Sequence, residues 1–253
     1  MMAEERRIEI WRLIQNEGRA RVKNLSRRFQ TSEVTIRQDL RGLEARGLIR
    51  RAHGGALAMA EIVAESPLLE RSQMMAAEKQ RIASAAAAMI EDGETIILDS
   101  GTTTQEIARR VKCRQQLRVI TNGVNVATEL LGQRGIQVIM LGGVLRQDSF
   151  SIVGHVAEEM LNEFAADKVF IGAAGCDADF GPSTPTLEEA RVNQAMVRSG
   201  RRHILVADSG KFGKRSLCRI VPLEEIHVVI TDTGLAESFR QQIRATGVEL
   251  ILT

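Results

Sequence analysis

Aromatic residues are scarce in this chain of 253 residues, which contains no Tyr, one Trp and seven Phe. The core of the folded protein must therefore be mostly aliphatic. The chain is long enough for one large domain or two modest ones. Its apolar fraction of 44% and charged fraction of 26% are those of an ordinary globular protein.

Cysteines and long apolar runs are also rare. Cys113, Cys176 and Cys218 are far apart and form no CxxC pair, which favours free, buried thiols in a reducing compartment. The histidines are isolated from other ligand types, so we expect no metal and no cofactor. The charged N-terminus lacks the apolar region of a signal peptide, and no stretch is long enough to span a membrane. We therefore expect a cytoplasmic protein that does not associate with membranes.

Charge is distributed unevenly along the chain. Residues 1–56 hold 13 Lys and Arg against 7 Asp and Glu, a net charge of +6, whereas the remainder carries a net charge of −4. A basic end on a mildly acidic body favours a polyanion-binding module joined to a second domain.

Three helices are predicted within the basic end, over residues 5–16, 22–29 and 32–47. The third can be capped by Ser32, and its apolar stripe consists of Ile36, Leu40 and Leu43. Two short helices separated by the tight break at residues 30–31 form a helix-turn-helix. The following sequence LIRRAHGGA, residues 48–56, predicts a basic hairpin, the wing of a winged helix.

The side chains opposite the apolar stripe are of the types that contact base edges and phosphates in a major groove. A single arginine on a helix surface is usually only solvated, and His53 could equally support the turn. The combination of helix spacing, net charge and basic wing nevertheless favours binding to double-stranded DNA. The candidate DNA-binding residues are Ser32, Val34, Thr35, Arg37, Gln38, Arg41, Arg50, Arg51 and His53.

The boundaries follow from these patterns. Residues 1–57 are predicted to form a winged helix-turn-helix domain. Residues 58–75 lack a clean periodicity, contain Pro67 and are predicted to form a linker. Residues 76–253 are predicted to form a larger α/β domain.

Short apolar runs alternate with helical patterns in the larger domain. Strands are predicted at 95–99, 118–121, 137–141, 168–172, 203–207 and 227–231, and helices at 104–111, 124–132, 154–164 and 187–199. Continuous apolar strands with helical crossovers indicate a mostly parallel sheet covered on both faces. Ligands of such folds bind beyond the carboxyl ends of the strands, and five polar or Gly-rich strand ends are expected to meet there.

The first of these strand ends is Ser100-Gly101-Thr102-Thr103-Thr104. A helix that begins near Thr104 presents free N–H groups and a positive dipole end, Gly101 lets the backbone approach a ligand, and the hydroxyl groups add donors. Arg146 or Lys211 could add a positive charge. The segment could also be no more than a capped strand-to-helix turn, but the other strand ends favour a phosphate site.

The segment SEVTIRQDLRGLEARGLIRRAHGGA resembles the N-terminal signature of the DeoR family of bacterial transcription regulators, and the resemblance extends over essentially the whole chain. Gln38 stands where the family often has an arginine. The resemblance implies an effector domain similar in fold to ribose-5-phosphate isomerases, in which the segment matching DSGTTT cradles the phosphate of an inducer. The segments DSGTTTQEIAR and TNGVNVA are most similar to the amino-sugar (AgaR-like) branch.

Residues from several strand ends are implied by this resemblance to bind the effector. Asn122 and Asn125 could instead only cap the following helix, and Gly143 could belong to a simple turn. The candidate effector-binding residues are Asp99, Ser100, Gly101, Thr102, Thr103, Thr104, Thr121, Asn122, Asn125, Gly143, Arg146, Gly175, Asp177 and Lys211.

Three functions are compatible with the sequence. The favoured one is a repressor of a sugar catabolism operon that a phosphorylated sugar, with amino-sugar phosphates among the candidates, releases from its operator. The repressor would be a homodimer or homotetramer, because operators are read by paired recognition helices. It would not be an enzyme, because no nucleophile–base pair is visible at the strand ends. The alternatives are a sugar-phosphate isomerase-like enzyme with a regulatory DNA-binding module and an architectural DNA-binding protein.

Overall fold

The first unit of the fold contains the predicted DNA-binding helices. The computed structural model describes residues 6, 7, 9–11, 13, 14, 19–45, 49–52, 54–58 and 68–253, and the chain divides into the units Met1–Glu61 and Ile62–Thr253. In the first unit, residues 6, 7, 9–11, 13 and 14 are helical. They are followed by β1 (Arg19–Arg21), α2 (Val22–Arg28), α3 (Glu33–Ala45), β2 (Ile49–Ala52) and β3 (Gly55–Ala58).

The predicted helix-turn-helix and wing are both present. The strands pair antiparallel in the order β1-β3-β2. The predicted stripe of Ile36, Leu40 and Leu43 is buried together with residues of the first helical segment and of α2. A Cβ on Gly55 would lie 2.2 Å from the backbone oxygen of Ala20, so only glycine allows β3 to approach β1 at this position. The first unit is a winged helix-turn-helix.

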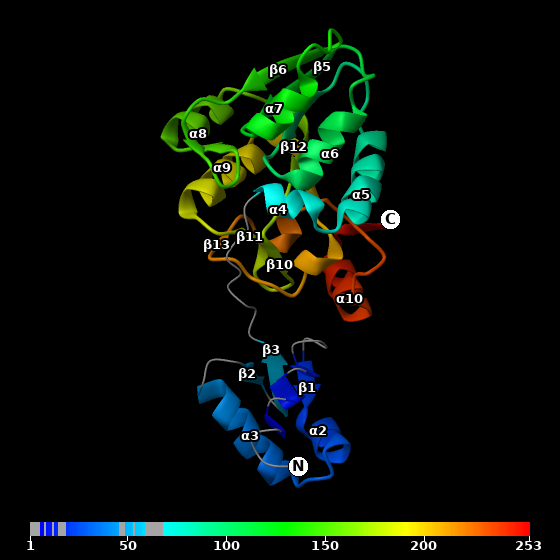
Figure 1. Ribbon diagram of the computed structural model, residues 1–253, viewed down its shortest axis with the longest axis vertical. Helices are drawn as coiled ribbons and strands as arrows, with labels where there is room; N and C mark the ends of the chain where they lie inside the picture. Colours follow the sequence, from blue (N-terminus) through cyan, green and yellow to red (C-terminus); the bar gives the residue numbers. More distant parts are fainter. Residues whose placement is uncertain are drawn as a thin grey trace. The chain divides into compact units, whose positions relative to one another are not determined.

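A seven-stranded parallel sheet forms the centre of the second unit (Figure 1). Its order is β15-β14-β12-β9-β4-β5-β6. The strands are β4 (Thr95–Leu98), β5 (Leu117–Thr121), β6 (Ile136–Met140), β9 (Ala166–Ile171), β12 (Gly200–Val206), β14 (Val228–Thr231) and β15 (Glu249–Leu252). All six predicted strands lie in this sheet, which confirms the predicted α/β class.

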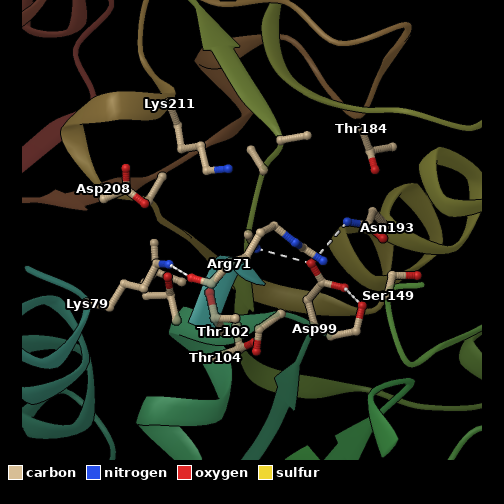
Figure 2. A pocket seen from close by; sticks show the side chains of 18 of the residues that line it. Arg71, Lys79, Asp99, Thr102, Thr104, Ser149, Thr184, Asn193, Asp208 and Lys211 are labelled. Carbon is tan, nitrogen blue, oxygen red and sulfur yellow. Dashed lines mark hydrogen bonds between the residues drawn. The ribbon is translucent and has the colours of Figure 1, made fainter. Parts of the chain in front are cut away.

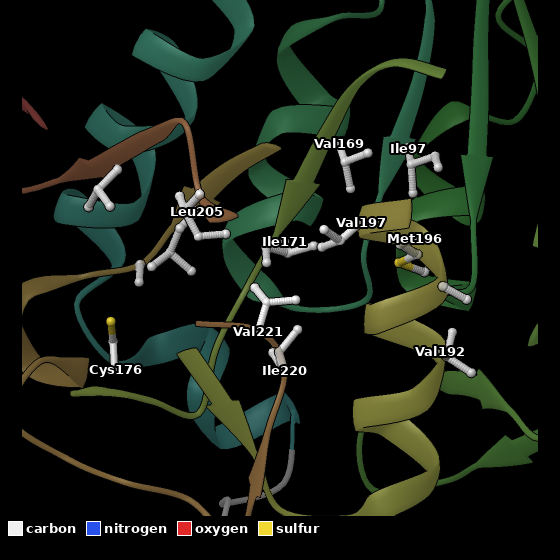
Figure 3. Close-up of a cluster of buried hydrophobic side chains, with 14 of the residues drawn as sticks. Ile97, Val169, Ile171, Cys176, Val192, Met196, Val197, Leu205, Ile220 and Val221 are labelled. Atoms are coloured by element: carbon white, nitrogen blue, oxygen red, sulfur yellow. The ribbon is translucent and has the colours of Figure 1, made fainter. Parts of the chain in front are cut away.

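Helices cover both faces of the sheet. Successive strand residues point to opposite sides, so each strand contributes side chains to two separate cores. Ile96 and Leu98 pack among α5 (Ala76–Ala88), α6 (Thr102–Arg110) and α7 (Val124–Leu130), which Figure 1 shows side by side. Ile97, between them, packs on the opposite face with α8 (His155–Asn162), α9 (Leu187–Arg198) and α10 (Glu237–Ala245). Figure 3 shows part of this second core, where Ile97 and Val169 of the sheet lie near Met196 of α9.

Several short elements of the second unit were not predicted. They are α4 (Leu68–Gln73), β7 (Val144–Arg146), β8 (Ser151–Val153), β10 (Gly175–Asp177), β11 (Gly181–Thr184), β13 (Cys218–Arg219) and the 3-10 helices η1 (Ser209–Lys211) and η2 (Leu223–Glu225). Helix α4 lies inside the segment predicted as a linker and belongs to the second unit. Pro67 and the rest of residues 59–67 lie outside the described residues.

The strand order changes direction between β4 and β9. From β4 the chain proceeds through β5 to β6 at one edge, whereas from β9 it proceeds through β12 and β14 to β15 at the other. The loops after β4 and β9 therefore diverge, and a crevice at this point is where open α/β sheets bind ligands. Within the described ranges, no helix has the length and apolar character needed to cross a membrane.

Candidate functional site

A polar pocket lies at the carboxyl ends of β4 and β9, where the strand order reverses (Figure 2). Its walls come from segments far apart in the sequence. The lining residues are Arg71, Lys79, Asp99, Ser100, Gly101, Thr102, Thr103, Thr104, Ser149, Gly172, Ala173, Ala174, Thr184, Glu189, Asn193, Val206, Ala207, Asp208 and Lys211.

The N-terminus of α6 forms one wall of this pocket. Gly101 is the N-cap residue with φ = +147°, and no side chain caps the helix. The first intrahelical acceptor is the Gly101 oxygen, which receives the N–H of Gln105 at 3.1 Å and the hydroxyl of Thr104 at 3.2 Å. The N–H groups of Thr102 and Thr103 and the helix dipole are therefore available to an anion.

Three cationic side chains line the same pocket: Arg71, Lys79 and Lys211. Lys79 is only 4% exposed. Its Nζ donates to the backbone oxygens of Arg71 at 2.5 Å and Met74 at 2.7 Å. Burial lowers the pKa of Lys79, Asp208 opposes this change, and Lys211 and Arg71 reinforce it. A bound anion would offset part of this unfavourable electrostatic environment.

Three buried carboxylates are also present. Glu189 is matched by Arg146 at 2.8 Å and accepts hydrogen bonds from Ser149 at 2.9 Å and Thr184 at 3.0 Å. Besides Glu189, the described lining residues include two carboxylates, Asp99 and Asp208, together with three cations and a helix N-terminus. The pocket consequently favours a ligand with negative charge.

Asp99 lies deep in the pocket beside Asn193 (Figure 2). One oxygen of Asp99 accepts the N–H of Gly172 at 3.1 Å and the Nδ2 of Asn193 at 3.2 Å. These contacts fix the carboxylate at the end of β4 and orient the amide next to it. Carboxylate and amide groups in this position can hydrogen-bond the hydroxyl groups of a polyol.

The structure brings half of the predicted effector residues together in this pocket. The residues that line it are Asp99, Ser100, Gly101, Thr102, Thr103, Thr104 and Lys211. The other candidates, Thr121, Asn122, Asn125, Gly143, Arg146, Gly175 and Asp177, do not line it.

Two of those other candidates, Asn122 and Asn125, support the loop that follows β4, and Thr121 supports the loop that follows β5. Asn122 Oδ1 accepts the N–H of Ser100 at 2.9 Å, Asn125 Nδ2 donates to the Gly101 oxygen at 2.9 Å, and Thr121 Oγ1 accepts the N–H of Gly123 at 3.0 Å. The two asparagines thus hold the backbone of the turn that leads into α6. They are not helix caps, since α7 has no side-chain cap.

The remaining candidates have structural contacts. Arg146 pairs with Glu189 and donates to Thr186 at 2.9 Å. Asp177 pairs with Arg215 at 2.6 Å. Gly143 has φ = +140° at the start of the β7–β8 hairpin, and a Cβ on Gly175 would lie 2.6 Å from a backbone oxygen. Arg146 thereby holds Glu189, which is a residue of the pocket wall.

Several pocket residues were not predicted: Arg71, Lys79, Ser149, Thr184, Glu189, Asn193 and Asp208. For Lys79 a signal exists, because it shares the inward stripe of α5 with Ile82, Ala83 and Ala86 at helical spacing. A single cation on an otherwise apolar, buried face indicates a functional or anchoring contact.

In the first unit, α3 presents the predicted DNA-contacting face. Val34 is 70% exposed, Arg37, Gln38 and Arg41 are exposed, and Thr35 is half-buried. Arg37 pairs with Glu33 at 2.9 Å on the helix surface. These side chains are therefore available to base edges and phosphates, opposite the buried stripe.

Ser32 caps α3 as predicted, because its Oγ accepts the N–H of Thr35 at 3.1 Å. In the wing, Arg51 pairs with Glu44 at 3.0 Å. The side chain of Arg50 and all of His53 lie outside the described residues. Asp39, not singled out from the sequence, is buried and pairs with Arg6 at 2.7 Å and Arg7 at 3.1 Å, which ties α3 to the first helical segment.

A winged helix-turn-helix with an exposed basic helix face, in one chain with an α/β unit that holds a polar pocket, is the architecture of a ligand-responsive transcription regulator. Two family models match the chain: the DeoR-like helix-turn-helix domain over residues 6–61 and the DeoR C terminal sensor domain over residues 74–233. The chain belongs to the DeoR family, which confirms the resemblance found in the sequence.

Relatives cover nearly the whole chain. A protein of Escherichia coli O157:H7 named for repression of the aga operon is 39% identical over 98% of this chain and 93% of its own length. The regulator GlpR of Haloferax volcanii is 35% identical over 99% and 98%. The glycerol-3-phosphate regulon repressor of Escherichia coli K12 is 30% identical over the full length of both chains. The predicted AgaR-like branch is supported by the first of these.

The chain also has structural neighbours among solved proteins. A ribose-5-phosphate isomerase in complex with phospho-erythronic acid aligns with 53% of this chain and 52% of its own, at 15% identity and a TM-score of 0.40. A likeness of this extent carries no argument about ligand or reaction.

Proposed function

We propose that this protein represses a sugar catabolism operon and that a phosphorylated sugar, bound in the pocket of the second unit, releases it from its operator. The observation that carries the proposal is the uncapped N-terminus of α6, which shares a pocket with three cations in the same chain as a winged helix. The names of the relatives support the same function.

In the proposed complex the phosphate lies against the N–H groups of Thr102 and Thr103, where dipole and hydroxyl groups stabilise negative charge. The sugar extends along the pocket, so that its hydroxyl groups meet Asp99 and Asn193, which lie together in Figure 2. Recognition of a phosphate and of hydroxyl groups would then come from two separate parts of one pocket.

The proposed DNA complex places α3 in a major groove. Arg37, Gln38 and Arg41 contact phosphates and base edges, and Val34 provides an apolar surface for a thymine methyl group. Because operators are read by paired recognition helices about one helical turn apart, we propose a dimer or tetramer. The effector shifts the population toward a state that fits the operator poorly.

An isomerase function is the alternative. It would need an acid–base pair at the pocket, and Asp99, Asp208, Glu189 and Lys211 are there. However, Glu189 is matched by Arg146 and by hydroxyl groups, which favours a structural carboxylate over a catalytic base. The relatives are named as regulators. We therefore propose a sensor that does not convert its ligand.

A ligand screen on the full chain tests this function. Thermal unfolding is measured with glucosamine 6-phosphate, fructose 6-phosphate and ribose 5-phosphate, and with the corresponding free sugars as controls. A phosphorylated sugar at 100 times its Kd is expected to stabilise the protein by about 2.7 kcal/mol, without turnover of the sugar. Equal shifts with free sugars would contradict a phosphate site, and steady conversion would favour the isomerase.

A further inference from the structure

Helix α4 occupies a special place along the chain. It directly follows residues 59–67, which contain the boundary between the two units, and two residues separate it from α5. A ligand that contacts α4 therefore contacts the first described element of the second unit, next along the chain to the DNA-binding unit.

Both ends of α4 are fastened to the second unit. Leu68 is buried, and its N–H donates to the backbone oxygen of Asp148 at 2.9 Å. At the other end, Lys79 Nζ holds the backbone oxygens of Arg71 and Met74, and Met75 turns the chain into α5 with φ = +51°. The lysine that holds α4 is itself part of the pocket wall.

Arg71 extends from α4 into the pocket. Figure 2 shows its side chain reaching past Lys79 toward Asp99 and Asn193. A guanidinium group can bind two phosphate oxygens at once and keeps its charge at all physiological pH values. The N-terminus of α6 supplies N–H donors to the same pocket, so an anion in the pocket can be bound by both elements.

We infer that Arg71 is an effector-contacting residue, and that a sugar phosphate joins α4 to the N-terminus of α6 by binding both through its phosphate group. This inference rests on the proposed function. The bound effector stabilises α4 against the second unit, and the free protein samples states in which α4 is less firmly held. Because α4 adjoins the connection to the DNA-binding unit, this difference couples the pocket to operator binding.

The experiment uses the full chain with glucosamine 6-phosphate and inorganic phosphate as probes. Affinity is measured by calorimetry, and hydrogen exchange is followed at the amides of residues 68–75. The test variant is Arg71→Gln, and the matched control is Arg81→Gln, which removes an exposed charge of α5 outside the pocket. Arg71→Lys keeps the charge but loses the planar fork, and Thr103→Val tests the other side of the site.

In the wild type, either probe is expected to slow exchange at residues 68–75. Arg71→Gln is expected to bind about tenfold more weakly, and at saturation its α4 amides exchange as in the free protein. Arg71→Lys should recover part of the affinity, while Arg81→Gln behaves as the wild type. If Arg71→Gln does not fold, the comparison is made with Arg71→Lys alone, for which an intermediate loss of affinity and of protection is expected.

If Arg71→Gln bound the probes as tightly as the wild type and showed the same protection of its α4 amides, the inference would be overturned and the proposed function would remain intact. Weaker binding with full α4 protection would overturn the coupling through α4. If the wild type bound neither these probes nor any sugar phosphate of the screen, the proposed function itself would fail. A loss of affinity in Thr103→Val but not in Arg71→Gln would locate the phosphate at α6 alone and would also overturn the inference.

Discussion

At the scale of single residues, the pocket separates groups that can meet the ligand from groups that hold them in place. Thr102 and Thr103 line the pocket, whereas Asn122 and Asn125 do not line it and hydrogen-bond the turn before α6. Substitution of Thr102 or Thr103 should change the affinity for the ligand. Substitution of Asn122 or Asn125 should change the shape of the turn before α6.

Replacing Thr103 with Val removes one hydroxyl donor without changing the volume of the side chain. Because a hydrogen bond to a charged group is worth about 1.5–3 kcal/mol, we expect Thr103→Val to bind sugar phosphates at least tenfold more weakly and to keep its affinity for DNA. Calorimetry checks the first result. The matched control is Thr128→Val at an exposed position of α7, where the Thr128 hydroxyl donates to the backbone oxygen of Val124. Unchanged affinity in Thr103→Val would show that this hydroxyl does not contact the effector.

Arg37 provides the corresponding test in the DNA-binding unit. Arg37 pairs with Glu33 on the helix surface, so removing its side chain should cost little stability. We expect Arg37→Ala to lower the affinity for an operator fragment selected from random DNA by about tenfold and to reduce its salt dependence. Exposed Arg191→Ala of α9 is the control. If operator affinity at physiological salt did not change, the placement of α3 in the groove would be incorrect.

At the scale of elements, the sequence predicted what depends on local pattern and missed what depends on tertiary pairing. Continuous apolar runs located β4 and β9, and the strand-end rule located Asp99 and the turn after it. Strand β15 was missed because it lies at an edge and begins with an exposed glutamate. Arg71 could not be assigned, since only the packing of α4 brings it to the pocket.

The ion cluster of Asp39 links two elements of the first unit. Asp39→Asn leaves Arg6 and Arg7 next to each other without their buried carboxylate, so we expect a loss of about 2 kcal/mol in the stability of this unit. Trp11, the one tryptophan of the chain, packs against the core of the same unit. Its fluorescence during urea unfolding measures the effect. The control is Glu33→Gln, which breaks an exposed pair and should cost less than about 0.5 kcal/mol. An equal loss of stability in Asp39→Asn and Glu33→Gln would argue against a special role for Asp39.

A second cluster joins α6 to α7 and makes stability depend on pH. The hydrogen bonds from Arg109, with contributions from Gln105 and Lys112, lower the pKa of Glu129 from 4.5 to about 2. A carboxyl group with a lowered pKa in the folded state contributes stability above its unfolded pKa, and this contribution is lost as the pH falls toward 2.

Glu129→Gln should therefore be less stable than the wild type at pH 7. Its free energy of unfolding should also fall less than that of the wild type as the pH is lowered from 5 toward 2. Urea unfolding at a series of pH values provides the measurement. Glu159→Gln, at an exposed position of α8, should keep the wild-type slope. A wild-type slope in Glu129→Gln would mean that this carboxyl group titrates alike in the folded and unfolded states.

At the scale of the whole molecule, the proposed function requires a coupling free energy between two units. The pocket and α3 belong to different units, and they can influence each other only if effector and operator prefer different states of the chain. A hundredfold loss of operator affinity on effector binding corresponds to about 2.7 kcal/mol, within the usual range for allosteric proteins.

Reciprocity makes this coupling measurable from either side. If glucosamine 6-phosphate weakens operator binding by a given factor, operator DNA must weaken glucosamine 6-phosphate binding by the same factor. We expect both factors to agree within error, as determined by calorimetry with and without operator and by DNA titration with and without the sugar phosphate.

Thr103→Val should lower affinity for the sugar phosphate equally in both states and leave the factor unchanged, because its hydroxyl acts within the pocket. Arg71→Gln should reduce the factor itself, because α4 transmits the change. A factor of one in both titrations would show that the pocket and the DNA-binding unit are not coupled.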